Sequence, residues 1–431
     1  MSDVAGRRIL VVTYYYPPST ASGANRWAAM VRHFRKLGHQ VWVVTSAATG
    51  ALGDDRELGV VRATDLVASG SLRRALHRPA LARPGDAPTN TAAPALLTSV
   101  FVPDAHVVSW TPWALAAARR LIARERVECV ITSGPPDSAH ITGLLLGHHR
   151  PAWIADFRDG WTFQPISNRW PTAIQRRLDG RLERLVAQRA ERTIGATRPI
   201  AEDLAARLGS RSSWISNGWD PELEGDVAAA VGPEVSEQGW VTLVHTGTLN
   251  SAAALGPGGR DPRPVLSALR AVNERAGARP RVRLVLAGQA TVEDEALLAQ
   301  SRLGDAVRHL GLLSRASAVA LQRQADGLLL ITGSNSSEAT GKLFEYLASG
   351  RPLIAVAGDN EAARIVRATG TGVVVAPGDG GAIAAAIEAL ADGSLARGYA
   401  PRELERFSYP GLAHAALELV EAAIAARGAR R

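Results

Sequence analysis

Residues 328–356 read LLLITGSNSSEATGKLFEYLASGRPLIAV, and this stretch contains a complete strand–helix–strand pattern. The runs Leu328–Ile331 and Leu353–Val356 are short and entirely apolar, as strands buried on both faces are. Between them, a turn of small and polar residues leads into a helical segment that begins near Leu343 and ends at Gly-Arg-Pro. Strands joined by a helix in this way run parallel in one sheet. The stretch therefore predicts an α/β fold.

The same alternation of short apolar runs and longer amphipathic segments extends over the whole chain. A chain of 431 residues is too long for one ordinary hydrophobic core. We therefore predict two doubly wound, Rossmann-like domains that face a cleft. The other strands that we expect are Ile9–Thr13, Val41–Thr45, Cys129–Thr132, Trp153–Asp156, Thr193–Ala196, Trp214–Ser216, Thr242–His245, Arg283–Ala287 and Gly372–Val375.

The polar stretch DPELEGDVAAAVGPEVSEQ, at 220–238, is the best candidate for a linker between the domains. It predicts an N-terminal domain over residues 1–221 and a C-terminal domain over 222–405. The remaining segment, 406–431, includes an expected helix at Gly411–Ala426. Residues 47–104, with scattered Gly, Pro and Arg, are predicted to form an irregular insertion in the first domain.

Three helices are expected in the first domain, at Asn25–Leu37, at Trp113–Arg124 and around residues 174–185. The third has leucine or isoleucine at three- and four-residue spacing, which predicts that one face of the helix is apolar. This face would consist of Ile174, Leu178, Leu182 and Leu185. Seven arginines lie between 169 and 192 in the same region, interrupted by acids at 179, 183 and 191. The mixture favours a solvated face of ion pairs over a nucleic-acid or membrane surface.

The overall composition indicates a globular protein and argues against a membrane-spanning one. Hydrophobic residues make up 46% of the chain, which is typical of a globular protein, and no apolar run approaches the ~20 residues of a membrane span. The apolar start of the chain is interpreted as a strand, not as a signal peptide. A single cysteine, Cys129, fits a reducing cytoplasm. The net charge of +8 suggests an anionic partner, although coding bias toward arginine explains it equally well. Weak peripheral contact with a membrane stays open, nucleic acid is not expected, and the oligomeric state is not indicated.

Lys342 is one of only two lysines among 49 basic residues. It lies at the start of the expected helix, where its charge opposes the helix dipole. An anion bound there would reverse this penalty, because backbone N–H groups, the dipole and the ammonium would converge on it. Glu345, one turn later, has two acceptor oxygens suited to the hydroxyls of a ribose. The alternative, a surface lysine beside a neighbouring glutamate, stays open.

Two further loops follow strands at their carboxyl ends. The first contains Gly23, ahead of a helix, and an ordinary turn explains it equally well. The second contains Gly247 and Thr248, then Gly258 and Gly259. Two arginines follow it, Arg260 and Arg263, and either could bind a diphosphate as a fork-shaped donor or remain a solvated side chain.

Taken together and in order, several stretches resemble the family-4 glycosyltransferases of the GT-B fold, and they cover nearly the whole chain. These are TYYYPPSTASGANRW, GHQVWVVTS, ATRPIAEDLAARLG, ISNGWD, LVHTGTL, LVLAG, GLLSR, EATGKLFEYLASGRPLIAV and IVRATGTGVVVAPGD. SGPPDSAHITGL and WIADFRDGW, in the first half, resemble one subgroup of that family.

The resemblance implies a nucleotide-diphosphate sugar bound mainly by the C-terminal domain and an acceptor mainly against the N-terminal domain. Transfer would retain the anomeric configuration and use neither metal nor cofactor, and the last helix would pack back on the first domain. The family's ribose-binding glutamate falls on Glu345. The remaining donor-binding positions fall on Gly23, Gly247, Thr248, Arg260 or Arg263, Leu312, Thr340, Gly341, Lys342 and Leu343, and the base would lie near the loop Gly311–Arg315.

The chain departs from the family pattern in two places. The family spaces two glutamates with seven residues between them, whereas Glu338 and Glu345 have six, so the contact of Glu338 with the donor sugar is in doubt. A His-Asp pair of the family is replaced by Arg158 and Asp159, which become candidates for contact with the transferred sugar or the acceptor. His140 is a further catalytic candidate, although a lone histidine at a helix start is more often structural. The tryptophans at 110, 113, 161 and 170 could line an acceptor pocket or simply pack.

Cleavage of a sugar–phosphate bond leaves negative charge on the diphosphate, which Lys342 and Arg260 would stabilise. The resemblance thus predicts a glycosyltransferase acting on a small natural product or on a cell-envelope glycan intermediate, free or lipid-linked. A nucleotide-sugar epimerase or hydrolase on the same scaffold, or a non-catalytic anion-binding protein, stays open as an alternative.

Overall fold

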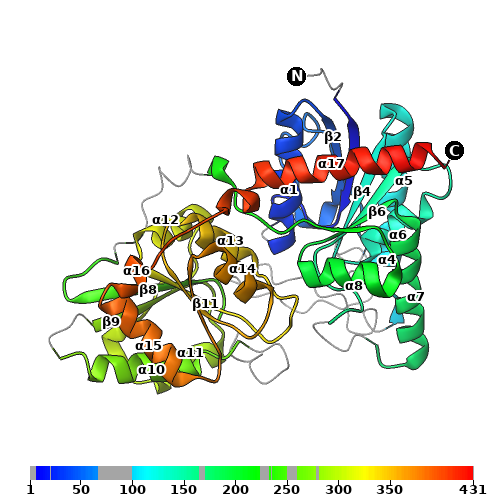
Figure 1. The fold of residues 1–431 in the computed structure, drawn as a ribbon. Coiled ribbons are helices and arrows are strands. Elements are labelled where there is room, and N and C mark those ends of the chain that lie inside the picture. Colours follow the sequence, from blue (N-terminus) through cyan, green and yellow to red (C-terminus); the bar gives the residue numbers. More distant parts are fainter. Residues whose placement is uncertain are drawn as a thin grey trace, which may run out of the picture. The chain divides into compact units, whose positions relative to one another are not determined.

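The computed structural model describes residues 6–19, 21–66, 100–164, 170–223, 233, 235–249, 260–277 and 281–430. The chain forms two compact units (Figure 1). One consists of Met1–Ser216 together with Tyr409–Arg431, and the other of Asn217–Ser408. We call them the N-terminal and the C-terminal unit. Among the helices of the described ranges, none combines the length and the apolar character needed to cross a bilayer.

The N-terminal unit contains a parallel sheet of seven strands in the order β3-β2-β1-β4-β5-β6-β7. The strands are β1 (Arg8–Thr13), β2 (Gln40–Ser46), β3 (Val60–Ala63), β4 (Cys129–Gly134), β5 (Ala152–Phe157), β6 (Arg192–Gly195) and β7 (Ser212–Trp214). The helices are α1 (Ser22–Lys36), η1 (Ala47–Thr49), α4 (His106–Ser109), α5 (Thr111–Glu125), α6 (Ser138–Leu145), α7 (Ala173–Arg189), α8 (Arg198–Leu208) and α17 (Tyr409–Gly428).

Strand β3 corrects part of the prediction of an irregular insertion over 47–104. Val60–Ala63 pair in register with the end of β2, so this segment adds a strand to the edge of the sheet. Residues 67–99 of the predicted insertion lie outside the described residues. A run of only four residues, following a Gly-rich turn, gave too short a periodicity to be recognised as a strand.

The C-terminal unit has a parallel sheet of six strands in the order β10-β9-β8-β11-β12-β13. The strands are β8 (Trp240–Thr246), β9 (Arg281–Ala287), β10 (Val307–His309), β11 (Gly327–Ile331), β12 (Leu353–Val356) and β13 (Gly372–Val375). The helices are η2 (Pro221–Leu223), α10 (Arg263–Glu274), α11 (Val292–Gln300), η4 (Gly304–Ala306), α12 (Arg315–Gln324), α13 (Gly341–Ala348), α14 (Glu361–Thr369), α15 (Gly380–Ala391), α16 (Ser394–Arg397) and η5 (Leu404–Phe407).

Strand order reverses once in each sheet. In the N-terminal unit the reversal lies between β1 and β4, and in the C-terminal unit between β8 and β11. The loops that leave these two strands at their carboxyl ends turn to opposite sides, which opens a crevice where ligands bind in doubly wound folds. The two reversal points therefore indicate where each unit would hold a ligand.

The last helix, α17, completes the core of the N-terminal unit. Alternate residues of β1 face opposite sides of the sheet, and Ile9 and Val11 pack on the side where α1 and α17 lie. The apolar side chains of α17 are buried there, and Figure 1 shows the helix running along this unit. They are Tyr409, Leu412, Ala413, Ala416, Val420 and Ala423. The chain thus returns to its first unit to cover one face of the sheet.

The apolar face predicted for α7 is not the face that the helix buries. Ile174 and Leu178 are 77% and 46% exposed, and Leu182 and Leu185 are only half-buried. The buried residues of α7 are instead Asp179, Glu183, Val186 and Ala187. Buried acids need partners, and these acids have them, so hydrogen bonding and not apolar periodicity sets the inward face of this helix.

Candidate functional site

The turn before α13 lies at the carboxyl end of β11, at the point where strand order reverses in the C-terminal unit. α13 begins at Gly341, two residues before the predicted start. Thr340 precedes it with an extended backbone, and its side chain makes no capping hydrogen bond. The Thr340 hydroxyl is buried and has no partner within the described residues. A Cβ atom on Gly341 would meet nothing within 4 Å. The amino end of α13 therefore has an open approach.

Lys342 extends from α13 to the end of β8. Its Nζ atom lies 3.2 Å from Nε2 of His245, and Nδ1 of His245 lies 2.9 Å from the carbonyl oxygen of Leu329. A carbonyl oxygen only accepts, so the proton of the neutral imidazole is on Nδ1 and Nε2 accepts from the Lys342 ammonium. The histidine thus holds the ammonium in place between β8 and α13.

Gly247 leaves room for this ammonium. Its backbone is left-handed, with φ of 95°, and a Cβ atom at this position would lie 2.9 Å from Nζ of Lys342. A side chain here would be strained and would also press on the charged group. The structure thus brings together two predicted residues, Lys342 and Gly247, that lie almost a hundred positions apart in the chain.

Burial changes the charge state of both partners. It lowers the pKa of Lys342 to about 7, and the neighbouring Arg260 lowers it further, while Glu345 and Glu338 act in the opposite direction. Burial also lowers the pKa of His245 to about 3, and the charge of Lys342 contributes to the same effect. His245 is therefore neutral at physiological pH. Lys342, in contrast, is poised between its two protonation states.

A buried hydrogen-bond network fixes the end of β8 next to the lysine. The Tyr346 hydroxyl accepts from the backbone N–H of Thr246 at 2.8 Å, and Nε2 of Gln322 donates to Oγ1 of Thr246 at 3.0 Å. Burial raises the pKa of Tyr346 to about 12, so its hydroxyl stays protonated. Sequence reasoning placed Thr246 at the carboxyl end of the strand but missed Gln322, Tyr346 and His245. A polar residue inside the apolar run LVHTG was the one available signal for His245.

Both predicted acids are paired with arginines. Arg260 donates to Oε1 of Glu338, with Nε at 2.9 Å and Nη2 at 2.7 Å, and the backbone N–H of Gly333 donates to the other oxygen at 2.7 Å. Nη2 of Arg315 lies 3.0 Å from Oε1 of Glu345. Arg315 starts α12, within the predicted loop 311–315. Each acid is thus held in place by a cation that a bound anion would attract.

The remaining C-terminal candidates differ in their exposure. Arg263 pairs with Asp261 at 2.8 Å and points into solvent, so of the two predicted arginines only Arg260 pairs with a predicted acid. Leu312 is 82% exposed, and Thr248 is also exposed. Leu343 is buried, and its N–H already donates to the carbonyl of Thr340. Gly258 and Gly259 lie outside the described residues.

In the N-terminal unit, Arg158 packs directly against Gly23. A Cβ atom on Gly23 would fall 1.4 Å from Nη1 of Arg158. The guanidinium also donates to two backbone carbonyls, from Nε to Gly134 at 3.1 Å and from Nη2 to Pro135. Burial lowers the pKa of Arg158, while the carboxylate of Asp159 raises it. The absence of a side chain at Gly23 therefore leaves room for the Arg158 guanidinium. Asp159, the next candidate along the chain, is exposed.

His140 is a packed core residue. It is fully buried on α6, its ring stacks on Phe157 with 4.6 Å between centroids, and Nδ1 lies 2.9 Å from the hydroxyl of Thr132. Burial lowers its pKa to about 3. Of the four tryptophans, Trp113 alone is exposed. Trp161 and Trp170 each donate their indole N–H to the carboxylate of Asp179 at 2.7 Å, which is the geometry of core packing.

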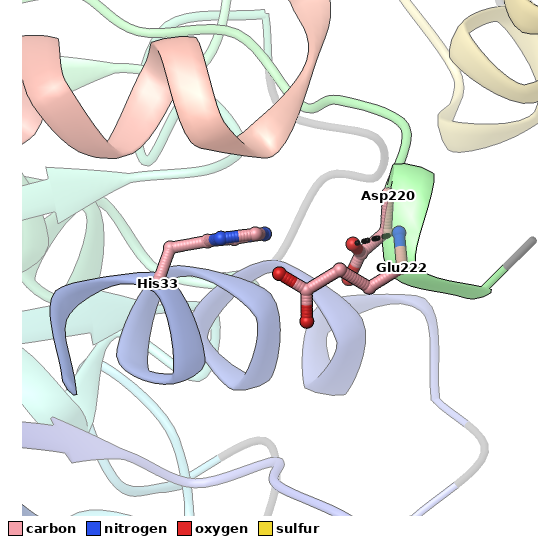
Figure 2. A group of neighbouring side chains, drawn as sticks. All are labelled: His33, Asp220 and Glu222. Atoms are coloured by element: carbon pink, nitrogen blue, oxygen red, sulfur yellow. Dashed lines mark hydrogen bonds between the residues drawn. The ribbon is translucent and has the colours of Figure 1, made fainter. Parts of the chain in front are cut away.

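Two other features of the described residues were considered as sites. Figure 2 shows Glu222 on η2 and Asp220 directly before it, and the N–H of Glu222 donates to the Asp220 carboxylate at 3.1 Å. His33, also drawn there, belongs to the other unit, so we infer no metal site from these side chains. A cavity of about 470 Å³ lies at the amino ends of β8 and β9, at the opposite edge of the sheet from Lys342.

Two family models match the chain. Residues 23–223 match the model described as Glycosyltransferase Family 4, and residues 261–392 match the one described as Glycosyl transferases group 1. No curated protein sequence matches the chain.

Solved structures share the architecture over nearly their full lengths. The chain is similar to sucrose-phosphate synthase from Thermosynechococcus elongatus, with 19% identity and a TM-score of 0.63, covering 97% of this chain and 100% of that one. It is also similar to α,α-trehalose 6-phosphate synthase from Burkholderia multivorans, with 14% identity, a TM-score of 0.63 and 99% of each chain covered. A putative UDP-N-acetylglucosamine 2-epimerase from Listeria monocytogenes is 12% identical, with a TM-score of 0.57 and 96% of each chain covered. At these identities the likeness establishes the fold.

Proposed function

Because the chain belongs to the glycosyltransferases of the GT-B fold that join a family 4 domain to a group 1 domain, we propose that it transfers a sugar from a nucleotide-diphosphate sugar to an acceptor. The C-terminal unit would bind the nucleotide-diphosphate sugar, and the N-terminal unit would bind the acceptor. The observation that carries the proposal is the ammonium of Lys342, held by His245 over Gly247 beside the open amino end of α13.

The diphosphate would lie at this ammonium. The amino end of α13 offers backbone N–H groups and the positive end of a helix dipole, and Lys342 adds a compact charge. Arg260 lies close enough to Lys342 to lower its pKa, although Arg260 is paired with Glu338 and both glutamates act in the opposite direction. A diphosphate would relieve the repulsion. On binding it, Arg260 would exchange its contact with Glu338 for the phosphate oxygens.

Glu345 would bind the ribose. Its carboxylate lies one turn after Lys342 on α13, and Arg315 at 3.0 Å keeps it oriented. The two carboxylate oxygens match a pair of vicinal hydroxyls in spacing and in acceptor character. The base would then lie toward the loop that contains Leu312, whose exposed side chain offers an apolar surface.

In the reaction, the bond between the anomeric carbon and the diphosphate oxygen breaks, and a bond from the acceptor nucleophile to that carbon forms. The electron pair of the broken bond stays on the diphosphate, and the proton of the acceptor nucleophile passes to the departing diphosphate oxygen. Lys342, Arg260 and the amides of α13 would stabilise the charge that develops on the diphosphate oxygen. We propose that transfer retains the anomeric configuration and proceeds without metal or cofactor. Arg158 and Asp159 would contact the transferred sugar or the acceptor.

The acceptor that we propose is a small natural product or a cell-envelope glycan intermediate, and the place of action is the cytoplasm. A second candidate function is epimerisation or hydrolysis of the nucleotide sugar, because a UDP-N-acetylglucosamine 2-epimerase shares the fold. That activity would consume or isomerise the nucleotide sugar with no acceptor present. A binding protein without catalysis would leave the nucleotide sugar unchanged.

A thermal-shift screen against UDP, GDP, dTDP and their sugars tests the proposed donor site. We expect one family of nucleotides to raise the melting temperature of the protein by several degrees, because a ligand that binds only the folded state stabilises it. Lys342→Ala should lose this shift, whereas Lys36→Ala, the matched removal of the other lysine, should keep it. A shift that is equal in both variants would remove Lys342 from the site.

A further inference from the structure

The helix α7 presents its apolar stripe to solvent. Ile174, Leu178 and Leu185 lie on one side of the helix because they follow one another at four- and seven-residue spacing. Ile174 is 77% exposed, and the stripe forms no part of the buried clusters of the described residues. Figure 1 shows α7 at the margin of the N-terminal unit, beside α6 and α8. An exposed stripe of this kind on a helix marks an interaction surface.

The two acids of α7 face the protein interior, and each is engaged there. Asp179 accepts from the indoles of Trp161 and Trp170, both at 2.7 Å. Glu183 accepts from the guanidinium of Arg207 at 2.9 Å and 3.0 Å, and from the backbone of Thr162 at 3.1 Å. Glu191, just after the helix, is buried against Arg150 at 2.8 Å. The acids that interrupt the basic run in the sequence therefore do not neutralise it on the surface.

The outer face of α7 is left with arginines and apolar residues. The helix carries five arginines, all exposed, at 176, 177, 181, 184 and 189. Arg177, Arg181 and Arg184 recur at three- and four-residue spacing, next to the stripe of Ile174 and Leu178. Within the described part of the chain none of these three has a hydrogen-bond or ion-pair partner. The interpretation of this region as a solvated face of ion pairs is therefore replaced by a surface that is basic and apolar.

We propose that the outer face of α7 binds the surface of an anionic lipid bilayer. An interfacial helix has basic residues that attract lipid phosphates and apolar residues that enter the boundary between headgroups and acyl chains. Each arginine near an anionic membrane strengthens binding roughly fivefold, and Arg177, Arg181 and Arg184 act together on one face. The phosphates of a nucleic acid would also attract these arginines, but they offer no apolar contact to Ile174 and Leu178. The apolar stripe therefore favours a bilayer over a nucleic acid as the partner.

The position of α7 relative to the sheet indicates which residues a bound bilayer would lie near. Because β5 and β6 run parallel and α7 connects them, the first turn of α7 lies at the carboxyl edge of the sheet. Arg158 and Asp159, which follow β5, lie at that same edge. A bilayer bound at Ile174 would therefore lie on the side from which an acceptor dissolved in or anchored to the membrane would enter. This last step rests on the proposed function, whereas the binding of the bilayer does not.

Sedimentation of the full-length protein with vesicles tests the binding. We expect the protein to bind vesicles of phosphatidylglycerol and phosphatidylcholine at low salt and not vesicles of phosphatidylcholine alone. Replacing Arg177, Arg181 and Arg184 by Gln should weaken binding on the order of a hundredfold, at roughly fivefold for each arginine. Ile174→Gln with Leu178→Gln should weaken it as well. The matched control replaces Arg270, Arg302 and Arg367 of the C-terminal unit, which removes the same charge and should leave binding unchanged.

A fluorescent label tests whether the apolar stripe itself enters the bilayer. Cys129 is fully buried, so Ile174→Cys provides the one accessible thiol of the described residues for an environment-sensitive dye. We expect its emission to shift to shorter wavelength on anionic vesicles. A dye at Val292→Cys, which is 78% exposed on α11, should not shift.

Three results would overturn the proposal. The first is wild-type protein that stays in the supernatant with anionic vesicles at low salt. The second is equal binding by the α7 triple variant and the control triple variant. The third is a protein that binds duplex DNA, but not vesicles, through the same arginines and regardless of Ile174 and Leu178. Loss of vesicle binding with nucleotide binding intact, in the α7 variants, would support the surface separately from the donor site.

Discussion

Lys342 is the residue on which the account of the donor site depends. The composition pointed to it, because a chain that uses arginine almost everywhere keeps a lysine at a helix start. A compact ammonium fits over Gly247, where a planar guanidinium would need more room. The sequence could not predict its partner, because His245 lies 97 positions away and becomes a neighbour only when β8 and β11 pair.

Substitution of the two α13 residues should separate chemistry from folding. We expect Lys342→Ala and Glu345→Ala each to cut transfer more than tenfold, because they remove a diphosphate charge partner and a ribose acceptor. Neither side chain belongs to the apolar core cluster of the C-terminal unit, so circular dichroism should show an unchanged fold. Steady-state rates with saturating donor and acceptor measure the effect. Arg302→Ala, in the same unit, serves as the control, and equal turnover by all three variants would remove the assignment.

Binding of a nucleotide sugar should be linked to a proton. The free enzyme has Lys342 with a pKa of about 7, and a diphosphate beside the ammonium raises that pKa. Affinity should therefore be highest below pH 7 and weaken as the pH rises above it. At pH 8, where most Lys342 is neutral in the free enzyme, binding should take up nearly one proton.

Titration calorimetry in two buffers of different ionisation enthalpy measures this uptake. A nucleotide sugar is the right ligand, because its diphosphate exchanges no proton near neutral pH. Lys342→Ala should show no linked uptake. Uptake that persists in this variant would assign the titration to another group.

At the scale of elements, α7 shows where apolar periodicity misleads. The spacing of Ile174, Leu178, Leu182 and Leu185 predicted an apolar face, but the face turned inward is another one, with Asp179 and Glu183. Strands were predicted well, because buried parallel strands read as continuous apolar runs. The orientation of α7 depends on long-range partners such as Trp161 and Arg207, and periodicity within one segment contains no information about them.

Asp179, which faces inward from α7, should contribute much of the stability of this region. Asp179→Ala would leave the indole N–H groups of Trp161 and Trp170 buried without acceptors, which costs roughly 1–3 kcal/mol for each group. We expect the free energy of unfolding to fall by about 2–4 kcal/mol in urea denaturation followed by tryptophan fluorescence. Asp179→Asn keeps one acceptor oxygen and should recover part of the loss. Arg181→Ala, on the outer face, should change the value by less than about 0.5 kcal/mol, and a comparable loss there would contradict the orientation of the helix.

At the scale of the whole molecule, the chain builds one unit from two separate segments. The contacts between residues end the first segment of the N-terminal unit at Ser216 and begin its second segment at Tyr409. The sequence, in contrast, predicted domain boundaries at residues 221 and 405. Composition marks where the chain is polar, but contacts decide where a unit ends. Both reversals of strand order follow from the pairing of β1 with β4 and of β8 with β11, which pair strands far apart in sequence.

Because α17 belongs to the N-terminal unit, a cavity in it should loosen that unit alone. Leu412→Ala removes a buried side chain between α17 and the sheet, at a cost of about 2–5 kcal/mol. Hydrogen exchange followed by mass spectrometry should show faster exchange in β1 and β4, with the C-terminal unit protected as in the wild type. Leu269→Ala, in the core of the C-terminal unit, should give the reverse pattern. Faster exchange in both units from either variant would contradict the division.

The two lysines of this chain allow a direct test of the donor site. In protein labelled with ¹³C at the lysine ε-carbon, NMR should give two signals, one from Lys342 and one from Lys36. We expect a nucleotide sugar to shift the Lys342 signal and to raise its titration midpoint above about 7, while Lys36 stays unchanged. Saturating binding of the nucleotide sugar with neither signal moved would show that the diphosphate lies elsewhere and would contradict the account.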